Sequence, residues 1–274
     1  MAFLKYSVTR VGSFFGDVMR VGVAFFLFSL PAIGQVRVGL QVEHRVVMEG
    51  EPMVATIMLQ NDSETPLVFN KIYHNATLEV NIRRGRVSGE PIFKTLDRNF
   101  VVMPDDSSKE LVELTSLSNM QQPGSYQVWA QVRYDGNVYA SRPQAFDVVH
   151  GIELASRQRH LPGYSDIRLT YSLRYCVRSG SEYAFLVVTD MQHKVSYGTF
   201  RLGTLVRVGA PAMDFDESGR MVVAHQSGRH RFTRSVISVH RDGAVFEDQT
   251  HHFPDGTPTT SGTGQSPEQA SKTP

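Results

Sequence analysis

The sequence predicts an all-β protein, built from an antiparallel β-sandwich and a following antiparallel β-meander. Apolar residues fall at every second position over several long stretches, which is the period of a strand with one buried face. Turns rich in Gly, Asn, Asp and Pro recur about every 8 to 12 residues, a spacing typical of sandwiches and meanders. No segment has the three-and-four spacing of an amphipathic helix of useful length.

The composition is that of an ordinary globular chain. Of 274 residues, 41% are hydrophobic and 20% are charged. Lys and Arg number 28 against 27 Asp and Glu, so no excess charge is available to follow a phosphate backbone, and we expect no nucleic acid partner. The single cysteine, Cys176, excludes an internal disulfide and a Cys-rich zinc site.

Residues 1–34 have the composition of a secretory signal peptide. A basic segment precedes a short apolar run, which ends in the small residues Ala32 and Gly34. We therefore predict cleavage before Gln35 and a periplasmic or secreted product that has no membrane contact after cleavage. A retained N-terminal anchor is the alternative. The basic residues are Lys5, Arg10 and Arg20, and the apolar run is 21–33.

Residues 35–149 are predicted to form the first domain. A turn at 61–66 is indicated by Asn, Asp, Ser and Pro, whose side chains or rings favour turn conformations. Pro52 lies in the break before the second strand. The expected strands are 36–42, 53–59, 67–73, 77–82, 99–103, 109–114, 126–134, a strand beginning at Val138, and 144–149.

The clearest signal is the segment Pro123–Tyr134 with the turn Asp135–Gly136 after it. Asp-Gly between two alternating strands is typical of a hairpin whose turn needs positive φ at both positions. Pro-Gly-x-Tyr before such a strand resembles the end of immunoglobulin-like sandwiches, in which Tyr126 looks like a tyrosine corner. The resemblance covers 36–149, lacks the cysteine pair of antibody domains, and implies an adhesive, spacer or interaction role.

Trp129 lies on the face opposite to Tyr126, in a row of polar residues. An indole at such a position can stack on a sugar or anchor a protein partner, so Trp129 is a candidate ligand-binding residue and the expected partner is an unknown protein or carbohydrate. The alternative is that Trp129 is covered by the second domain or by a loop.

Residues 150–252 are predicted to form a second β-meander domain. Residues 150–163 are polar and without period, which favours a linker or opening loop. A long strand at 167–177 places Cys176 on its polar face. Later strands are expected at 183–188, 220–224, 231–239 and 245–246, and a small sandwich, a rolled meander or a blade-like fragment all remain possible.

Two segments of this domain are candidate metal sites. Asp214, Asp216 and Gly219 match the first half of a calcium loop, but His225 stands where the final bidentate Glu belongs, so a decorated β-turn is the alternative. A two-residue turn at Ser227–Gly228 would place His225 opposite His230. That pair is a possible transition-metal site, or simply two solvated histidines. A third ligand would come from His240, His251 or His252.

No motif for catalysis or cofactor binding is present: the chain has no Gly-rich phosphate loop, no Ser elbow and no zinc-protease helix signature. We therefore predict no cofactor and no catalytic residue, although scattered carboxylates leave no local trace and enzyme activity stays open. The leading hypothesis is an exported binding or scaffolding protein. The alternatives are a carbohydrate-active or other hydrolytic enzyme with a metal-assisted site in the second domain, and a structural subunit of a cell-surface assembly. Residues 253–274 are predicted to be a disordered tail.

Overall fold

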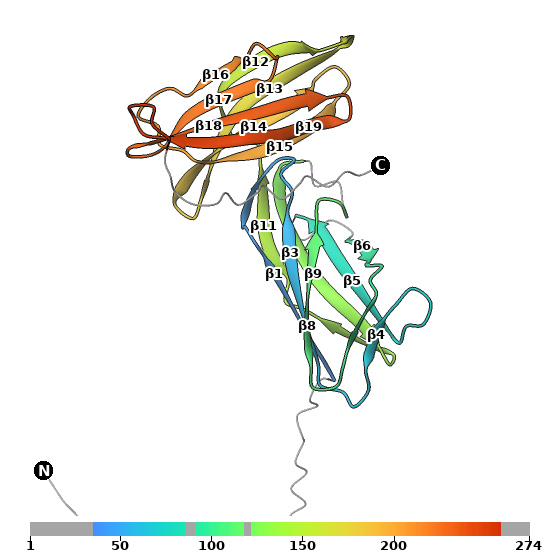
Figure 1. Ribbon diagram of the computed structural model, residues 1–274. Coiled ribbons are helices and arrows are strands. Elements are labelled where there is room, and N and C mark those ends of the chain that lie inside the picture. Colours follow the sequence, from blue (N-terminus) through green and yellow to red (C-terminus); the bar gives the residue numbers. More distant parts are fainter. Residues whose placement is uncertain (1–34, 86–90, 118–121, 259–274) are drawn as a thin grey trace, which may run out of the picture. The chain divides into compact units, whose positions relative to one another are not determined.

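The computed structural model describes residues 35–85, 91–117 and 122–258, and within these ranges every regular element is a β-strand (Figure 1). The predicted all-β fold class is therefore confirmed. The predicted signal peptide and most of the predicted tail lie outside the described residues. None of the described residues belongs to a helix that is long and apolar enough to span a membrane.

Residues 36–149 form three sheets (Figure 1). One has the order β1-β3-β8, one has the order β2-β11-β9-β5-β6 with β10 added to β9, and β4 pairs with β7. All described pairs are antiparallel except β2 with β11. The strands are β1 Val36–Val42, β2 Val46–Met48, β3 Val54–Asn61, β4 Leu67–Phe69, β5 Ala76–Arg84, β6 Ile92–Thr95, β7 Phe100–Val102, β8 Ser107–Glu113, β9 Gly124–Tyr134, β10 Asn137–Ala140 and β11 Gln144–Val149.

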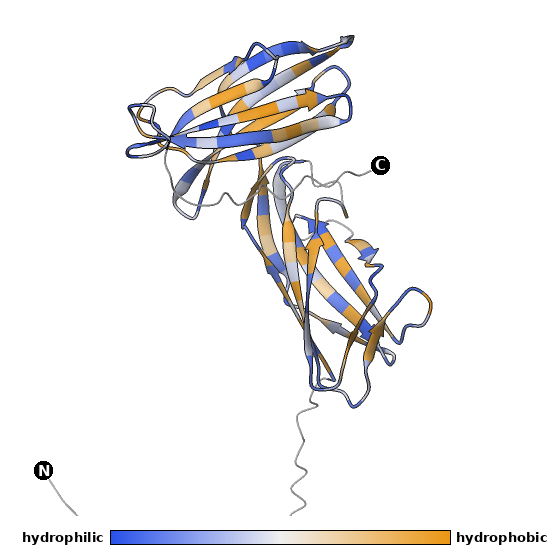
Figure 2. Cartoon of the chain, in the orientation of Figure 1, coloured by the Kyte–Doolittle hydropathy of each residue, from blue (hydrophilic) through white to orange (hydrophobic). Residues whose placement is uncertain are grey.

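These sheets share one hydrophobic core, as the alternating sequence requires. From Ala76 to Ile82 in β5 and from Tyr126 to Val132 in β9 the even-numbered side chains are buried. Most odd-numbered ones lie on the outer face, a pattern visible as alternating colours in Figure 2. Strands of the three-stranded sheet supply the facing half of the core. Its members include Ile57, Leu59, Leu78, Val80, Ile82, Val128, Ala130 and Val132.

Two predicted turns have the expected chemistry. Asp135 and Gly136 both adopt positive φ, 49° and 74°, so the Asp-Gly hairpin is confirmed. In the turn after β3, the Ser63 amide donates to Asn61 Oδ1 at 3.0 Å. The predicted strand 67–73 is too long, because Asn70 Oδ1 accepts the Ile72 amide at 2.8 Å and starts a turn directly after β4.

Tyr126 occupies the position that the sequence predicted for a tyrosine corner. Its hydroxyl donates to the Gln122 carbonyl, four residues upstream, at 2.7 Å. Its ring is buried and stacks on Phe146 with a centroid distance of 5.4 Å. The tyrosine therefore fastens the chain that enters β9 to the core between the sheets.

Residues 152–252 form two four-stranded antiparallel sheets, β12-β13-β14-β15 and β16-β17-β18-β19, in which neighbouring strands follow one another along the chain. One core, with Leu173, Leu186 and Ile237 among its members, draws side chains from both sheets. The strands are β12 Ile152–Leu161, β13 Tyr164–Arg178, β14 Ser181–Asp190, β15 Val195–Thr204, β16 Ala212–Phe215, β17 Met221–Gly228, β18 Arg231–His240 and β19 Gly243–His252.

The prediction of a linker or opening loop at 150–163 was wrong, because β12, Ile152–Leu161, occupies most of this segment. β12 is an edge strand paired only with β13, and nearly all its side chains are exposed or half-buried, so no alternation marks it in the sequence. Strands β2, β6, β15 and β16 were also missed. All four lie at sheet edges. In addition, β2, β6 and β16 are short, and β15 is rich in Gly, Ser and Thr.

The prediction that Cys176 lies on the polar face of its strand was also wrong. Cys176 is buried in a small second cluster with Met48, Phe185 and Val187, on the face of β13 and β14 that points away from their main core. These two strands are thus covered on both faces. This explains why residues 184–188 are continuously apolar rather than alternating.

Candidate ligand-binding face

Trp129 lies on the outer face of the six-stranded sheet, as predicted, and is half-buried there. In register it stands directly opposite Asn81 on β5, and Asn81 in turn stands opposite Phe93 on β6. Phe93 is 59% exposed. We call the row Phe93, Asn81, Trp129, together with its neighbours Glu79, Arg83, Gln127 and Gln131, the Trp129 face.

Asn81 carries hydrogen-bonding capacity that the described protein does not use. Its side chain is fully buried, yet neither Oδ1 nor Nδ2 has a partner within the described part of the chain. A buried amide left unpaired costs about 1–3 kcal/mol. Native structures rarely keep such a group without a reason, and a ligand that supplies the missing partners is one.

The neighbours of Asn81 hold one another in place. The Arg83 guanidinium lies over the Trp129 ring, 5.9 Å from its centroid, and donates to Gln127 Oε1, while its buried Nε has no partner among the described residues. Glu79 accepts hydrogen bonds from Gln131 and, at 3.1 Å, from Arg133 Nε. The face therefore brings an indole together with amide, guanidinium and carboxylate groups.

Sequence reasoning identified Trp129 but missed Asn81, Arg83 and Phe93. The polar residues at odd positions of β5 were visible in the sequence. Their position beside Trp129 was not, because it depends on the register of β5 with β6 and with β9, and β9 is far from β5 in the chain.

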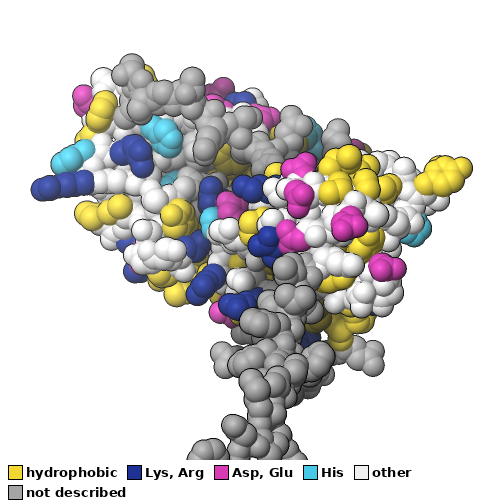
Figure 3. Space-filling model, turned by 90° about the horizontal axis from the view of Figure 1, so that it is seen from below, with side chains coloured by type: hydrophobic (Ala, Val, Ile, Leu, Met, Phe, Trp, Pro, Cys, Tyr) yellow, Lys and Arg dark blue, Asp and Glu magenta, His cyan; other side chains and the backbone are white. Residues whose placement is uncertain are grey.

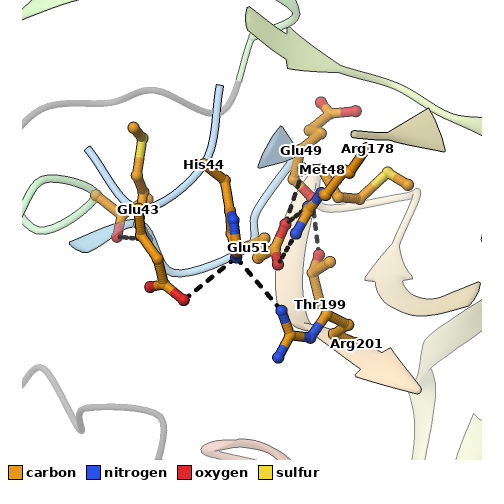
Figure 4. A network of polar contacts seen from close by, with 10 residues as sticks. Glu43, His44, Met48, Glu49, Glu51, Arg178, Thr199 and Arg201 are labelled. Carbon is orange, nitrogen blue, oxygen red and sulfur yellow. Dashed lines mark hydrogen bonds and ion pairs between the residues drawn. The ribbon is translucent and has the colours of Figure 1, made fainter. Parts of the chain in front are cut away.

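A second polar cluster surrounds Glu51 and Arg178 (Figure 4). Arg178 binds both Glu51 oxygens, at 2.9 Å for Nη1 to Oε1, and Glu51 Oε2 also accepts the Met48 amide at 2.9 Å. Burial alone would lower the pKa of Arg178, but hydrogen bonds and charge attraction from Glu51 outweigh it and raise the pKa. Both groups are buried and paired with each other, so this cluster holds two parts of the fold together and is not a binding site.

The loop that carries Glu51 is fixed by a further contact. Thr199 Oγ1 donates to the Glu49 carbonyl at 2.8 Å. Gly50 has φ of 76°, and a Cβ atom there would lie 2.7 Å from Thr199 Oγ1, so only glycine fits this close approach. The adjacent His44 Nε2 lies 3.3 Å from both Glu43 Oε1 and Arg201 Nη1 (Figure 4).

His225 and His230 do not face one another, so the predicted register of this hairpin was wrong. The two-residue turn consists of Arg229 and His230, and a bulge near Ser227 shifts the pairing so that His225 stands opposite Thr233. His230 lies in the turn itself. Bulges of this kind cannot be recognised from the turn residues alone.

His225 is buried and neutral. Burial lowers its pKa to about 4, against a weaker opposing effect of the Thr204 carbonyl, which lies 3.1 Å from Nε2. That contact assigns the proton to Nε2, and Nδ1 has no partner among the described residues. Beyond it, Thr233 Oγ1 lies 2.9 Å from His251 Nδ1 and donates to Ser227 Oγ at 2.7 Å.

Asp214 and Asp216 occupy the end of β16 and the turn that follows it. Asp216 Oδ1 accepts the Arg220 amide at 2.9 Å, and Oδ2 accepts Arg220 Nε at 2.8 Å. These bonds lower the pKa of Asp216, the side-chain bond from Arg220 being the main cause. Asp214 Oδ1 accepts the amide of Phe215. The segment is thus a β-turn whose second carboxylate is already neutralised by an arginine.

The described residues contain no group of three or more His, Cys, Asp and Glu side chains arranged to hold a metal ion. In the space-filling view of Figure 3, basic, acidic and hydrophobic side chains all occur, and none of these kinds forms a continuous field across the visible face. The Trp129 face is therefore the candidate site that the geometry supports best.

Comparisons with solved structures give distant structural similarity to β-rich domains. No family model matches the chain, and no curated protein matches it. Among solved structures, the sporulation control protein Spo0M from Bacillus subtilis is 11% identical, with 62% of this chain and 89% of that chain covered and a TM-score of 0.29. The CARDB domain of a Pyrococcus furiosus protein is 14% identical, with 42% and 87% covered and a TM-score of 0.26.

A third similar structure is the DNA glycosylase AlkC from Pseudomonas fluorescens, which is 15% identical, with a TM-score of 0.29. The match covers 42% of this chain and 30% of the glycosylase, so this chain spans less than a third of that protein. Similarity at this level says nothing about the function of this chain. The proposed function is based on the Trp129 face.

Proposed function

We propose that the mature chain is an exported, non-catalytic binding protein whose ligand lies on the Trp129 face. The observation that carries this proposal is the fully buried Asn81 carboxamide, which has no partner among the described residues and lies in one row with Trp129 and Phe93. A ligand that supplies those hydrogen bonds recovers part of the free energy that the unliganded protein loses there.

Export is part of the same proposal, supported by the signal-peptide pattern of residues 1–34. So is the division into an immunoglobulin-like domain at 35–149 and a second domain at 150–252. The tyrosine-corner bond of Tyr126 supports the first assignment, and the separate cores of the two regions support the division. Such sandwiches commonly act as binding or spacer modules.

Co-sedimentation with insoluble cell-envelope material of the producing organism tests the proposal. We expect the mature protein to bind, and Trp129→Ala to lose most of that binding. Tyr73→Ala is the matched control, because Tyr73 is an aromatic residue of the same region, 81% exposed and outside the Trp129 face. Equal binding by wild type and Trp129→Ala, with both proteins folded, would refute the assignment of the ligand to this face.

A further inference from the structure

The unpaired hydrogen-bonding groups of the Trp129 face narrow the class of ligand that this face can bind. The carboxamide of Asn81 has both an acceptor and a donor group without partners, and the adjacent Arg83 Nε is a further donor, among the described residues. A ligand that satisfies all three needs groups that donate and accept at closely spaced positions. Adjacent hydroxyl groups have this property, since each hydroxyl is both donor and acceptor.

The surroundings of Trp129 favour a sugar over a protein partner. The centre of a protein interface is depleted of Glu and Asp, whereas the Trp129 face includes Glu79, which accepts hydrogen bonds from Gln131 and Arg133. A peptide cannot add as a new strand beside Trp129 or Asn81, because β9 and β5 are each already paired on both sides. A pyranose ring presents a flat C–H surface to an indole and hydroxyls at its rim.

We infer that the Trp129 face binds a carbohydrate chain, with one sugar ring on the Trp129 indole and its hydroxyls bound by Asn81 and Arg83. This inference rests on the proposed function and names its ligand class. Asn81 stands between Phe93 and Trp129 in the pairing of the strands, and its side chain is fully buried. A sugar therefore reaches the carboxamide only when neighbouring side chains on this face move. Binding therefore changes the environment of the indole.

Trp129 is the only tryptophan of the chain, so the tryptophan emission, excited where tyrosine does not absorb, reports on this face alone. The probes are hydroxyethyl cellulose, glucomannan and dextran, whose sugar rings carry adjacent hydroxyl groups. We expect at least one of them to shift the emission and to retard the protein in affinity electrophoresis. Asn81→Ala should weaken the retardation at least tenfold, and Tyr73→Ala should leave it unchanged. Trp129→Phe, which keeps a ring for stacking, should bind more strongly than Trp129→Ala.

Pretreatment of the envelope material separates the failure of this inference from the failure of the proposed function. Periodate, which breaks the C–C bond between neighbouring carbons that both carry hydroxyls, should abolish Trp129-dependent co-sedimentation, and protease should not. If protease abolishes it, periodate spares it, and no polysaccharide retards the protein, the ligand is a protein and the inference is overturned. The proposed binding function then still holds. If Trp129→Ala binds the envelope as wild type does, both are overturned.

Discussion

Replacing Arg178 by Met should destabilise the protein strongly, because it leaves the buried Glu51 carboxylate without its counter-charge. The relative exposures of Glu51 and Arg178 are 7% and 6%, so water replaces little of the lost interaction. Methionine retains the apolar stem of the arginine. It cannot replace the two hydrogen bonds to Glu51, nor the cation over the Phe185 ring at 4.8 Å.

Breaking a buried ion pair from one side costs about 3–5 kcal/mol. For a chain of this size, that loss corresponds to a Tm lower by roughly 6–20 °C. The remaining hydrogen bond from the Met48 amide to Glu51 is a single neutral donor and compensates little. Adding Glu51→Gln should recover most of the loss, since a neutral amide needs no counter-charge and still accepts the Met48 hydrogen bond.

Urea denaturation, followed by far-UV circular dichroism and by Trp129 emission, measures the free energy of unfolding. The matched control is Arg207→Met, which removes an ion pair to Glu182 whose side chains are 48% and 26% exposed and should cost at most about 1 kcal/mol. A loss below about 1 kcal/mol for Arg178→Met, or a double variant no more stable than the single one, would refute the reasoning.

Three further predictions concern buried groups. His225 is neutral in the folded protein and takes up a proton in the unfolded chain below pH 6.5, so the free energy of unfolding should fall by up to about 3 kcal/mol as the pH falls from 6.5 toward 4. Unfolding curves of His225→Gln should therefore depend less steeply on pH than those of wild type. Parallel pH dependences of the two proteins would contradict this. The Cys176 thiol, whose pKa is raised mainly by burial, should react with Ellman's reagent only in denaturant, and rapid labelling of native protein would show that the cluster around it opens. Tyr126→Phe removes the 2.7 Å bond to the Gln122 carbonyl and should cost about 1 kcal/mol in urea denaturation, while an unchanged midpoint would mean that the corner contributes only packing.

Local patterns in the sequence determined the fold class and many strand positions. Alternation along β1, β5, β9 and β13 follows from one buried face, and Asp135–Gly136 fixes its hairpin through the positive φ of both residues. The position of Trp129 on the outer face also followed from the period of two. These features depend only on residues that are close in sequence, and so a single sequence reveals them.

Tertiary structure alone decided which side chains meet. Asn81 joins Trp129 through the register of β5 with β9, Arg178 meets Glu51 across 127 positions of the chain, and a bulge near Ser227 separates His225 from His230. Edge strand β12 escaped detection because neither of its faces is buried consistently. Register, bulges and long-range pairing depend on the free energy of the whole packed structure, so no local pattern of residue types contains them.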